Sequence, residues 1–378
     1  MSELLKKYEE EALKVFDENF VSNENILRLA DMAQLSDDDK NQIREFLSAI
    51  DEETRHFIWL FYYIQFQSGE DFTKDKWEID KIPMPPKCEE KFPGMIKTVV
   101  YLLAYENLLL WIKERNLSES IADGYFDRYR AIVSLNHISH NTCGLCRLSP
   151  FLYGYAKPFM LRIGRLAYEV IEYRDYCEMY ENQGGERIFA ALPNYTYDEY
   201  GLQSEDGKVP SYRCDESRVY AHIFDEAGKL SKEQMCIDLN EYTKILSPGD
   251  NVITIHIPEG GKLEVKDVLD SIRDAKEIFT AHFEPFKAIV CHTWFIDRAL
   301  RGEVIKDSSN MAAFADLFDV ISGSDNKYHS VFEHIFKTVP QPFENLVPQN
   351  SFQQRALDYV KNGKRLYWAY GVLRNDII

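Results

Sequence analysis

Residues 251–297 read NVITIHIPEGGKLEVKDVLDSIRDAKEIFTAHFEPFKAIVCHTWFID, and this stretch decides the fold. Short β-branched, apolar runs at 251–257 and 286–296 predict two strands. Between them, 264–283 predicts an amphipathic helix, because its apolar residues recur at helical spacing. Those residues are Val265, Val268, Leu269, Ile272, Ala275 and Phe279. A strand, a helix and a second strand in this order predict a parallel pair joined by a right-handed crossover.

The segment before residue 251 also has the texture of strands. Short strand-like runs occur at 160–171, 217–224 and 233–246. The turn-forming sequence EAGK at 226–229 predicts a hairpin. We therefore expect antiparallel strands beside the parallel pair.

The N-terminal part reads differently, as helices. Leu4, Leu5, Tyr8, Ala12 and Phe16 lie near helical spacing. Further apolar stripes follow at 41–66 and 94–113, with a proline-rich connector, KIPMPPK, at 81–87. The sequence thus predicts an α/β (α+β) protein with a helical domain at 1–150 and a mixed-sheet domain at 151–378.

Composition narrows the function classes. The 62 acidic residues outnumber the 44 basic ones and give a formal charge of -18, which argues against nucleic-acid binding. Seven cysteines are an odd number in a long chain, so we expect reduced thiols. No basic region followed by an apolar stretch opens the chain, and the longest apolar runs fall short of a membrane span or contain charges. We expect a cytoplasmic protein without a membrane partner.

Several ordered runs resemble a known family. They are RIGRLAYE at 162–169, NVITIHIP at 251–258 with Gly260-Gly261, FKAIVCHTWFID at 286–297, Ser309-Asn310-Met311 and, more loosely, NSFQQRA at 350–356. The chain resembles bacterial proteins in which an N-acyltransferase N-terminal domain precedes a GNAT-like C-terminal domain. The resemblance implies a GNAT-like mixed sheet with helices on both faces. It also implies direct acyl transfer, from acetyl-CoA or another acyl-CoA, to an unidentified small-molecule acceptor, by expectation an amine.

The resemblance further implies where acyl-CoA would lie. In such enzymes the loop after the 251–257 strand and the next helix hold the pyrophosphate with backbone amides. This points to Ile257, Gly260, Gly261 and Lys262, with Ser309 and Asn310 near the cofactor. Ile257 and Lys262 depart from the family's usual loop pattern, and Leu317 stands where many relatives have a tyrosine acid. A tight strand-to-helix turn accounts for the two glycines equally well.

His256 is the leading candidate base. Alternation along 251–257 turns Ile253 and Ile255 toward the helix and turns Thr254 and His256 the other way. Imidazole titrates near neutrality, as a base for an ammonium proton requires. Thr254 would contact substrate on the same face. A structural, half-buried histidine is the alternative.

Two further pairs share a face if their strands are continuous. Arg165 and Glu169 lie four residues apart, so Arg165 could orient substrate and Glu169 assist catalysis, or the two could form a structural ion pair. His292 and Trp294 would likewise face a substrate pocket as catalytic and substrate-binding residues. Cys291 points to the opposite face from His292, which disfavours a thiol–imidazole dyad.

The remaining motifs favour no other class strongly. His137, His140, Cys143 and Cys146 could hold zinc only in an irregular segment, and no metal is expected. Walker, Rossmann, HExxH and GxSxG motifs are absent from the sequence. The favoured function is acyl-CoA-dependent acyl transfer. The alternatives are a non-catalytic GNAT-fold module that binds a ligand or a protein, and a metal-dependent hydrolase.

Overall fold

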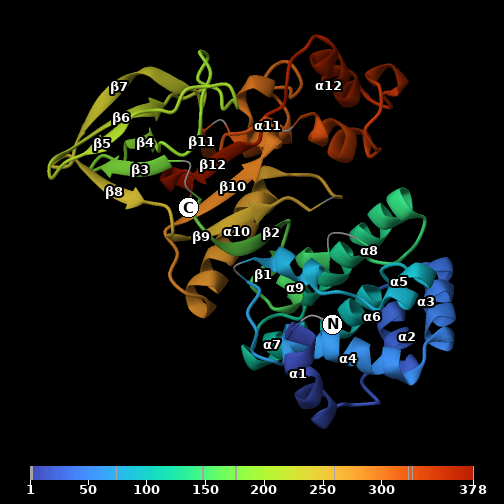
Figure 1. Cartoon of the computed structure of the whole chain (residues 1–378). Coiled ribbons are helices and arrows are strands. Elements are labelled where there is room, and N and C mark those ends of the chain that lie inside the picture. Colours follow the sequence, from blue (N-terminus) through green and yellow to red (C-terminus); the bar gives the residue numbers. More distant parts are fainter. Residues whose placement is uncertain are drawn as a thin grey trace. The chain divides into compact units, whose positions relative to one another are not determined.

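The computed structural model describes residues 3–73, 75–146, 149–174, 177–258, 260–321, 323–325 and 327–377. The chain divides into two compact units, unit 1 (Met1–Ile163) and unit 2 (Gly164–Ile378). The domain boundary predicted from the sequence, 150/151, falls inside the helix α9 of unit 1 (Ser149–Ala156). Each unit is visible in Figure 1 by its labelled elements.

Unit 1 is helical, as the sequence predicts. Its helices are α1 (Glu3–Lys14), α2 (Asn23–Met32), α3 (Asp37–Ala49), α4 (Glu52–Phe66), α5 (Pro86–Lys91), α6 (Met95–Leu103), α7 (Tyr105–Glu114), α8 (Ser120–His140) and α9. Ser36 begins α3 with a capping box, because its hydroxyl accepts the amide of Asp39 while the Asp39 carboxylate accepts the amide of Ser36. The unit ends with the short strand β1 (Met160–Ile163).

Helix α6 is the centre of unit 1. Every residue from Met95 to Leu103 is buried, since the run MIKTVVYLL offers apolar side chains on all faces. Its one cation, Lys97, lies 2.5 Å from the Asp80 carboxylate. The stretch Met95–Glu114 has the length and apolarity of a membrane span, but 72% of the relevant window is buried inside the protein, as in an ordinary core helix.

The first sheet of unit 2 contains the predicted parallel pair. In unit 2 its strand order is β2-β9-β10-β12-β11. The strands are β2 (Leu166–Glu172), β9 (Asn251–His256), β10 (Ala288–Thr293), β11 (Phe318–Ile321) and β12 (Ala369–Leu373). Strands β9 and β10 are parallel and the other neighbours are antiparallel. Helix α10 (Val265–His282) connects β9 to β10, which confirms the predicted strand–helix–strand unit.

One face of this sheet is covered by α10. The buried residues of the helix include Val268, Ile272 and Phe279. The hydroxyl of Tyr168 on β2 lies 2.8 Å from the Ser271 hydroxyl of α10. Because Tyr168 pairs with Ile255 across the sheet, the α10 face carries the isoleucines of β9.

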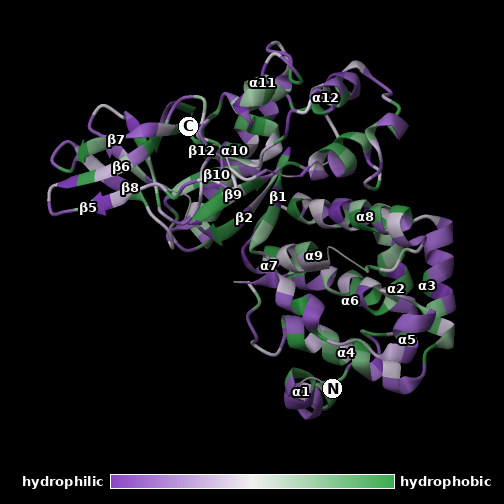
Figure 2. Cartoon of the chain, turned by 45° about the horizontal axis from the view of Figure 1, so that its top comes forward, coloured by the Kyte–Doolittle hydropathy of each residue, from purple (hydrophilic) through white to green (hydrophobic). Residues whose placement is uncertain are grey.

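A second sheet packs on the other face. Its order is β5-β6-β4-β3-β8, and β7 pairs with β6. The strands are β3 (Cys177–Asn182), β4 (Arg187–Ala191), β5 (Tyr212–Cys214), β6 (Arg218–Phe224), β7 (Leu230–Asp238) and β8 (Tyr242–Leu246). One buried cluster joins Met179 and Phe189 of this sheet to Val252, Val290 and Val372 of the first. The hydrophobic colour of β9 in Figure 2 reflects burial on both faces.

The structure differs from the predicted strands where turns lie inside apolar runs. The predicted run 160–171 is two strands, because the chain turns at Gly164 and Arg165. The run 233–246 likewise divides into β7 and β8, whereas the predicted 226–229 hairpin does connect β6 to β7. Helices α11 (Asn310–Ala315) and α12 (Ser351–Lys361) complete unit 2.

Candidate functional site

Polar side chains form a row across four neighbouring strands, on the sheet face that points away from α10. We call Glu169, His256, His292 and Tyr370 the polar row. Glu169 pairs with Thr254, and His292 pairs with Tyr370. The β9–β10 ladder ends at Ile255 and Cys291, so His256 and His292 lie one residue beyond it on adjacent strands. The row therefore sits where the parallel strands stop pairing, directly before the loop to α10.

His256 and Glu169 are in direct contact. The Nε2 atom of His256 lies 2.8 Å from Oε2 of Glu169. The Glu169 side chain is 6% exposed and that of His256 is 36% exposed. An ionised carboxylate accepts the Nε2–H bond, which favours one tautomer and holds the imidazole ring in place. The pair thus has the arrangement of a carboxylate-supported base that remains reachable from solvent.

His292 provides a neutral neighbour for that pair. Burial, together with smaller contributions from the nearby Arg174 and His256, lowers the pKa of His292 to about 4. The rings of Trp368 and Tyr370 lie 5.8 and 6.0 Å from its imidazole. Near neutral pH this imidazole carries no charge, so it adds a polar but uncharged surface beside His256.

Cys291 belongs to the opposite face, as expected. Its thiol is fully buried, and burial raises the pKa of Cys291 far above the usual range. The sulfur lies 3.7 Å from the Ile255 carbonyl oxygen. These surroundings suit an inert core thiol rather than a nucleophile.

The loop between β9 and α10 is built on two left-handed glycines. Gly260 has φ +79° and Gly261 has φ +70°, conformations that other residues rarely adopt. Lys262 is exposed, and Ile257 is half-buried just after β9. Helix α10 then begins without a side-chain cap at Glu264. Exposed amides and an uncapped helix start are compatible with a diphosphate group.

Arg165 does not have the position that the sequence analysis gives it. It lies in the turn before β2, so it is not on a strand face shared with Glu169. Its guanidinium instead donates to the carbonyl oxygens of Pro258 and Lys262, each at 3.0 Å. The structure connects Glu169 to His256 and connects Arg165 to the loop. Neither contact has a local sequence signal, because both depend on β2 pairing with β9.

The other predicted contacts separate into different parts of unit 2. Thr254 is buried beside Glu169 in the sheet. Trp294 was expected on the strand face of His292, but the strand ends at Thr293 and Trp294 opens a 3-10 turn, η2 (Trp294–Ile296). There it packs in an apolar cluster with residues of α12, its ring 6.5 Å from that of Phe352.

Ser309 and Asn310 begin α11. The Ser309 hydroxyl accepts the amide of Ala312 and donates to the carbonyl of Lys306, so it caps the helix. Leu317, at the position of the family's tyrosine acid, is buried. Tyr370, which no sequence pattern had indicated, lies in the polar row, where it pairs with His292.

The possible metal ligands of unit 1 are dispersed. His137 contacts Asp39 at 2.6 Å, and Cys143 is buried with its sulfur 3.6 Å from that of Met95. His140 is exposed. Within the described ranges, no cluster of three or more His, Cys, Asp or Glu side chains could hold a metal ion.

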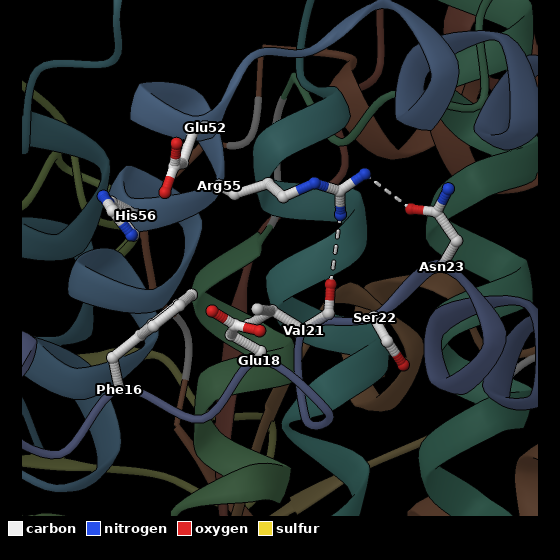
Figure 3. Close-up of a pocket in the computed structure, with 8 residues that line it drawn as sticks. All are labelled: Phe16, Glu18, Val21, Ser22, Asn23, Glu52, Arg55 and His56. Atoms are coloured by element: carbon white, nitrogen blue, oxygen red, sulfur yellow. Dashed lines mark hydrogen bonds between the residues drawn. The ribbon is translucent and has the colours of Figure 1, made fainter.

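Unit 1 also contains an open pocket with a cavity volume of about 280 Å³, drawn in Figure 3. Arg55 occupies one side, where it donates to Asn23 Oδ1 at 2.7 Å and to the Val21 carbonyl at 3.3 Å. The Phe16 and His56 rings meet edge to face with centroids 4.7 Å apart. The guanidinium of Arg55 is thus already engaged with neutral oxygens of the pocket wall.

Comparison with solved structures shows which proteins share the fold. An acyltransferase mutant in complex with octanoyl-CoA has a similar fold, with a TM-score of 0.62 and 14% identity over 93% of this chain and 88% of that chain. An acyltransferase in complex with decanoyl-CoA gives 0.61 and 15%, with the same coverage. One in complex with CoA and 10C-Teicoplanin gives 0.60 and 14%, also over 93% and 88%. At these identities the likeness shows a shared fold.

The family follows from the sequence itself. The model described as the GNAT-like C-terminal domain matches residues 160–373, more than half of the chain. No curated protein matches. The chain therefore belongs to the family of proteins with a GNAT-like C-terminal domain.

Proposed function

We propose that the protein is an acyltransferase that uses acyl-CoA and acylates an amine on a small molecule. The observation that carries the proposal is the His256–Glu169 pair, which lies at the end of β9 immediately before a glycine loop. Family membership and the fold of solved acyl-CoA complexes support the donor. The loop amides and the start of α10 fit the diphosphate of such a donor.

His256 supplies the proton chemistry of direct transfer. It accepts the proton that the amine loses as its nitrogen attacks the thioester carbonyl. Glu169 stabilises the resulting imidazolium and keeps its ring oriented. As the tetrahedral intermediate collapses, the carbon–sulfur bond breaks and the thiolate takes a proton, which the imidazolium of His256 can return. One proton is thus moved, and no metal or oxidant is needed for balance.

The acyl chain and the acceptor are open within this proposal. The sequence resemblance implies acetyl-CoA or another acyl-CoA, and the similar solved structures hold octanoyl-CoA and decanoyl-CoA. Two of those structures also hold teicoplanin or its derivative. Amines on larger polar molecules therefore belong in an acceptor panel together with simple amines.

A non-catalytic binding module is the second candidate. Leu317 is buried at the position where many GNAT enzymes have a tyrosine that acts as a general acid. The absence of this hydroxyl favours a protein without catalytic activity. A module of this kind would still bind a ligand in the same loop. Catalysis and binding must consequently be measured separately.

Calorimetric titration of the purified protein with CoA, acetyl-CoA, octanoyl-CoA and decanoyl-CoA tests the donor. Mass spectrometry of CoA release with the amine panel tests transfer. We expect saturable binding of at least one acyl-CoA and acceptor-dependent release of CoA. Binding without release would support the module, and absence of binding to all four compounds would refute acyl-CoA as the substrate.

A further inference from the structure

Arg165 lies outside the loop between β9 and α10 and binds two of its backbone carbonyls. The loop sequence, IPEGGKLE at 257–264, contains no arginine. Arg165 donates from Nη1 to the Pro258 carbonyl and from Nε to the Lys262 carbonyl, at 3.0 Å each. These two carbonyls lie on either side of the glycine pair. One planar guanidinium therefore joins the beginning of the loop to its end.

The turn that contains Arg165 is itself bound to α10. The backbone amide of Leu166, the next residue, donates to the Ser271 hydroxyl at 3.3 Å. Gly164 has φ +56°, and a Cβ there would meet Ser271 Cβ at 3.3 Å, so the turn lies against the helix. The turn is therefore bound both to α10, through Leu166, and to the loop, through Arg165. We call this arrangement the frame.

This frame determines where the loop amides point. A trans peptide directs its N–H opposite to its C=O, so a Lys262 carbonyl that faces Arg165 turns the Leu263 N–H away from it. In the described part of the chain, no hydrogen bond uses the backbone N–H of Gly260, Gly261, Lys262 or Leu263. These donors are left for a ligand or for water.

We infer that Arg165 is a positioning residue, which fixes the β9–α10 loop in the conformation that presents these amides to the diphosphate of acyl-CoA. The inference rests on the proposed function for its ligand. It assigns Arg165 to the loop instead of to the acceptor substrate. A lysine could replace the charge but not the planar fork that reaches two carbonyls at once.

The test compares Arg165→Met and Arg165→Lys with the intact full-length protein. Charged hydrogen bonds of this kind contribute enough that we expect the dissociation constant for CoA to rise about tenfold or more in R165M, and less in R165K. Affinity for an acyl-pantetheine thioester, which lacks the diphosphate and the nucleotide, should stay within about twofold of the intact protein. The matched control is Arg273→Met, because Arg273 lies on α10 and pairs with the nearby Asp270 at 2.9 Å.

A second measurement needs no ligand. Trypsin should cut after Lys262 faster in R165M than in the intact protein or R273M, because the freed loop adapts more readily to a protease. Equal CoA affinity in R165M, or equal loss of CoA and acyl-pantetheine binding, would overturn the inference. If the intact protein binds no CoA, the proposed function fails, whereas the cleavage rate still decides whether Arg165 holds the loop.

Discussion

The His137–Asp39 pair of unit 1 and the His256–Glu169 pair of unit 2 have almost the same geometry. His137 Nε2 lies 2.6 Å from Asp39 Oδ1, and His256 Nε2 lies 2.8 Å from Glu169 Oε2. The imidazoles are 32% and 36% exposed, and both carboxylates are below 10%. Distance and burial alone therefore do not separate a structural pair from a catalytic one.

The surroundings of the two pairs differ. Asp39 also accepts from the Ser36 hydroxyl at 2.7 Å, so this carboxylate caps α3 while His137 connects it to α8. Glu169 lies within strand β2, and its carboxylate contacts His256 across the sheet. His256 ends its strand beside the neutral His292. It also lies directly before the loop whose backbone N–H groups at 260–263 are left for a ligand or water. The hydrogen bond is alike in the two pairs. What makes His256 a candidate base is its position next to a possible ligand site.

The largest expected effect comes from His256→Ala. Loss of a general base should lower kcat for acyl transfer about a hundredfold or more, with little change in acyl-CoA affinity, because the base acts on the acceptor. Single-turnover transfer and calorimetric titration measure the two quantities. Activity within threefold of the intact protein would exclude His256 as the base and would make the two pairs equivalent.

Glu169→Gln should have the next largest effect. Glutamine keeps the size and one oxygen but loses the charge that stabilises the imidazolium, so we expect kcat to fall about tenfold. The matched change in the other pair is Asp39→Asn, which should leave kcat unchanged. A pH–rate profile of both variants distinguishes a catalytic role of the carboxylate from a packing role. Only E169Q should displace the ascending limb of the profile of kcat against pH. Equal profiles would show that Glu169 has a packing role.

The sequence predicted the elements whose pattern is local. Residues 251–297 have the spacing of a strand, a helix and a strand, and the structure has β9, α10 and β10 there. Alternation also put Thr254 and His256 on the face away from α10, as observed. Helical periodicity likewise identified unit 1. Each of these inferences needed only residues within about twenty positions.

Contacts between distant segments were beyond the sequence. The partner of His256 is 87 residues away, and only the pairing of β2 with β9 brings Glu169 to it. The turn at Gly164 and Arg165 lies inside an apolar run, so it was read as continuous strand. Tyr370 joins the row through β12, a strand that follows a long segment without clear periodicity. The register between two strands depends on how both pack in the folded sheet. The sequence of either strand alone does not reveal it.

Two buried groups of unit 2 respond to acid in opposite ways, namely His292 at the end of β10 and Asp297 directly after η2. The pKa of His292 falls from 6.5 to about 4, so the unfolded chain binds its proton first and stability decreases as pH falls between these values. Burial raises the pKa of Asp297 from 3.8 to about 6, so the folded chain keeps its proton longer and stability decreases as pH rises between them. The two contributions oppose each other in the intact protein.

Single variants should separate these contributions. Between pH 4 and 6, His292→Phe should become less stable with rising pH and Asp297→Asn more stable, each by roughly 1–2 kcal/mol. Urea unfolding at several pH values measures the slopes. If both variants follow the slope of the intact protein, neither group titrates differently in the folded and unfolded states.

The smallest effect is expected from His137→Ala. Removing the imidazole leaves Asp39 with its capping bonds, so the free energy of unfolding should fall by about 1 kcal/mol. Because this pair leads to no ligand site, kcat and acyl-CoA affinity should stay within about twofold of the intact protein. Urea unfolding and the transfer assay measure the two outcomes on one preparation. A large loss of turnover without a loss of stability would instead place the His137–Asp39 pair in the catalytic machinery and would reverse the distinction between the two pairs.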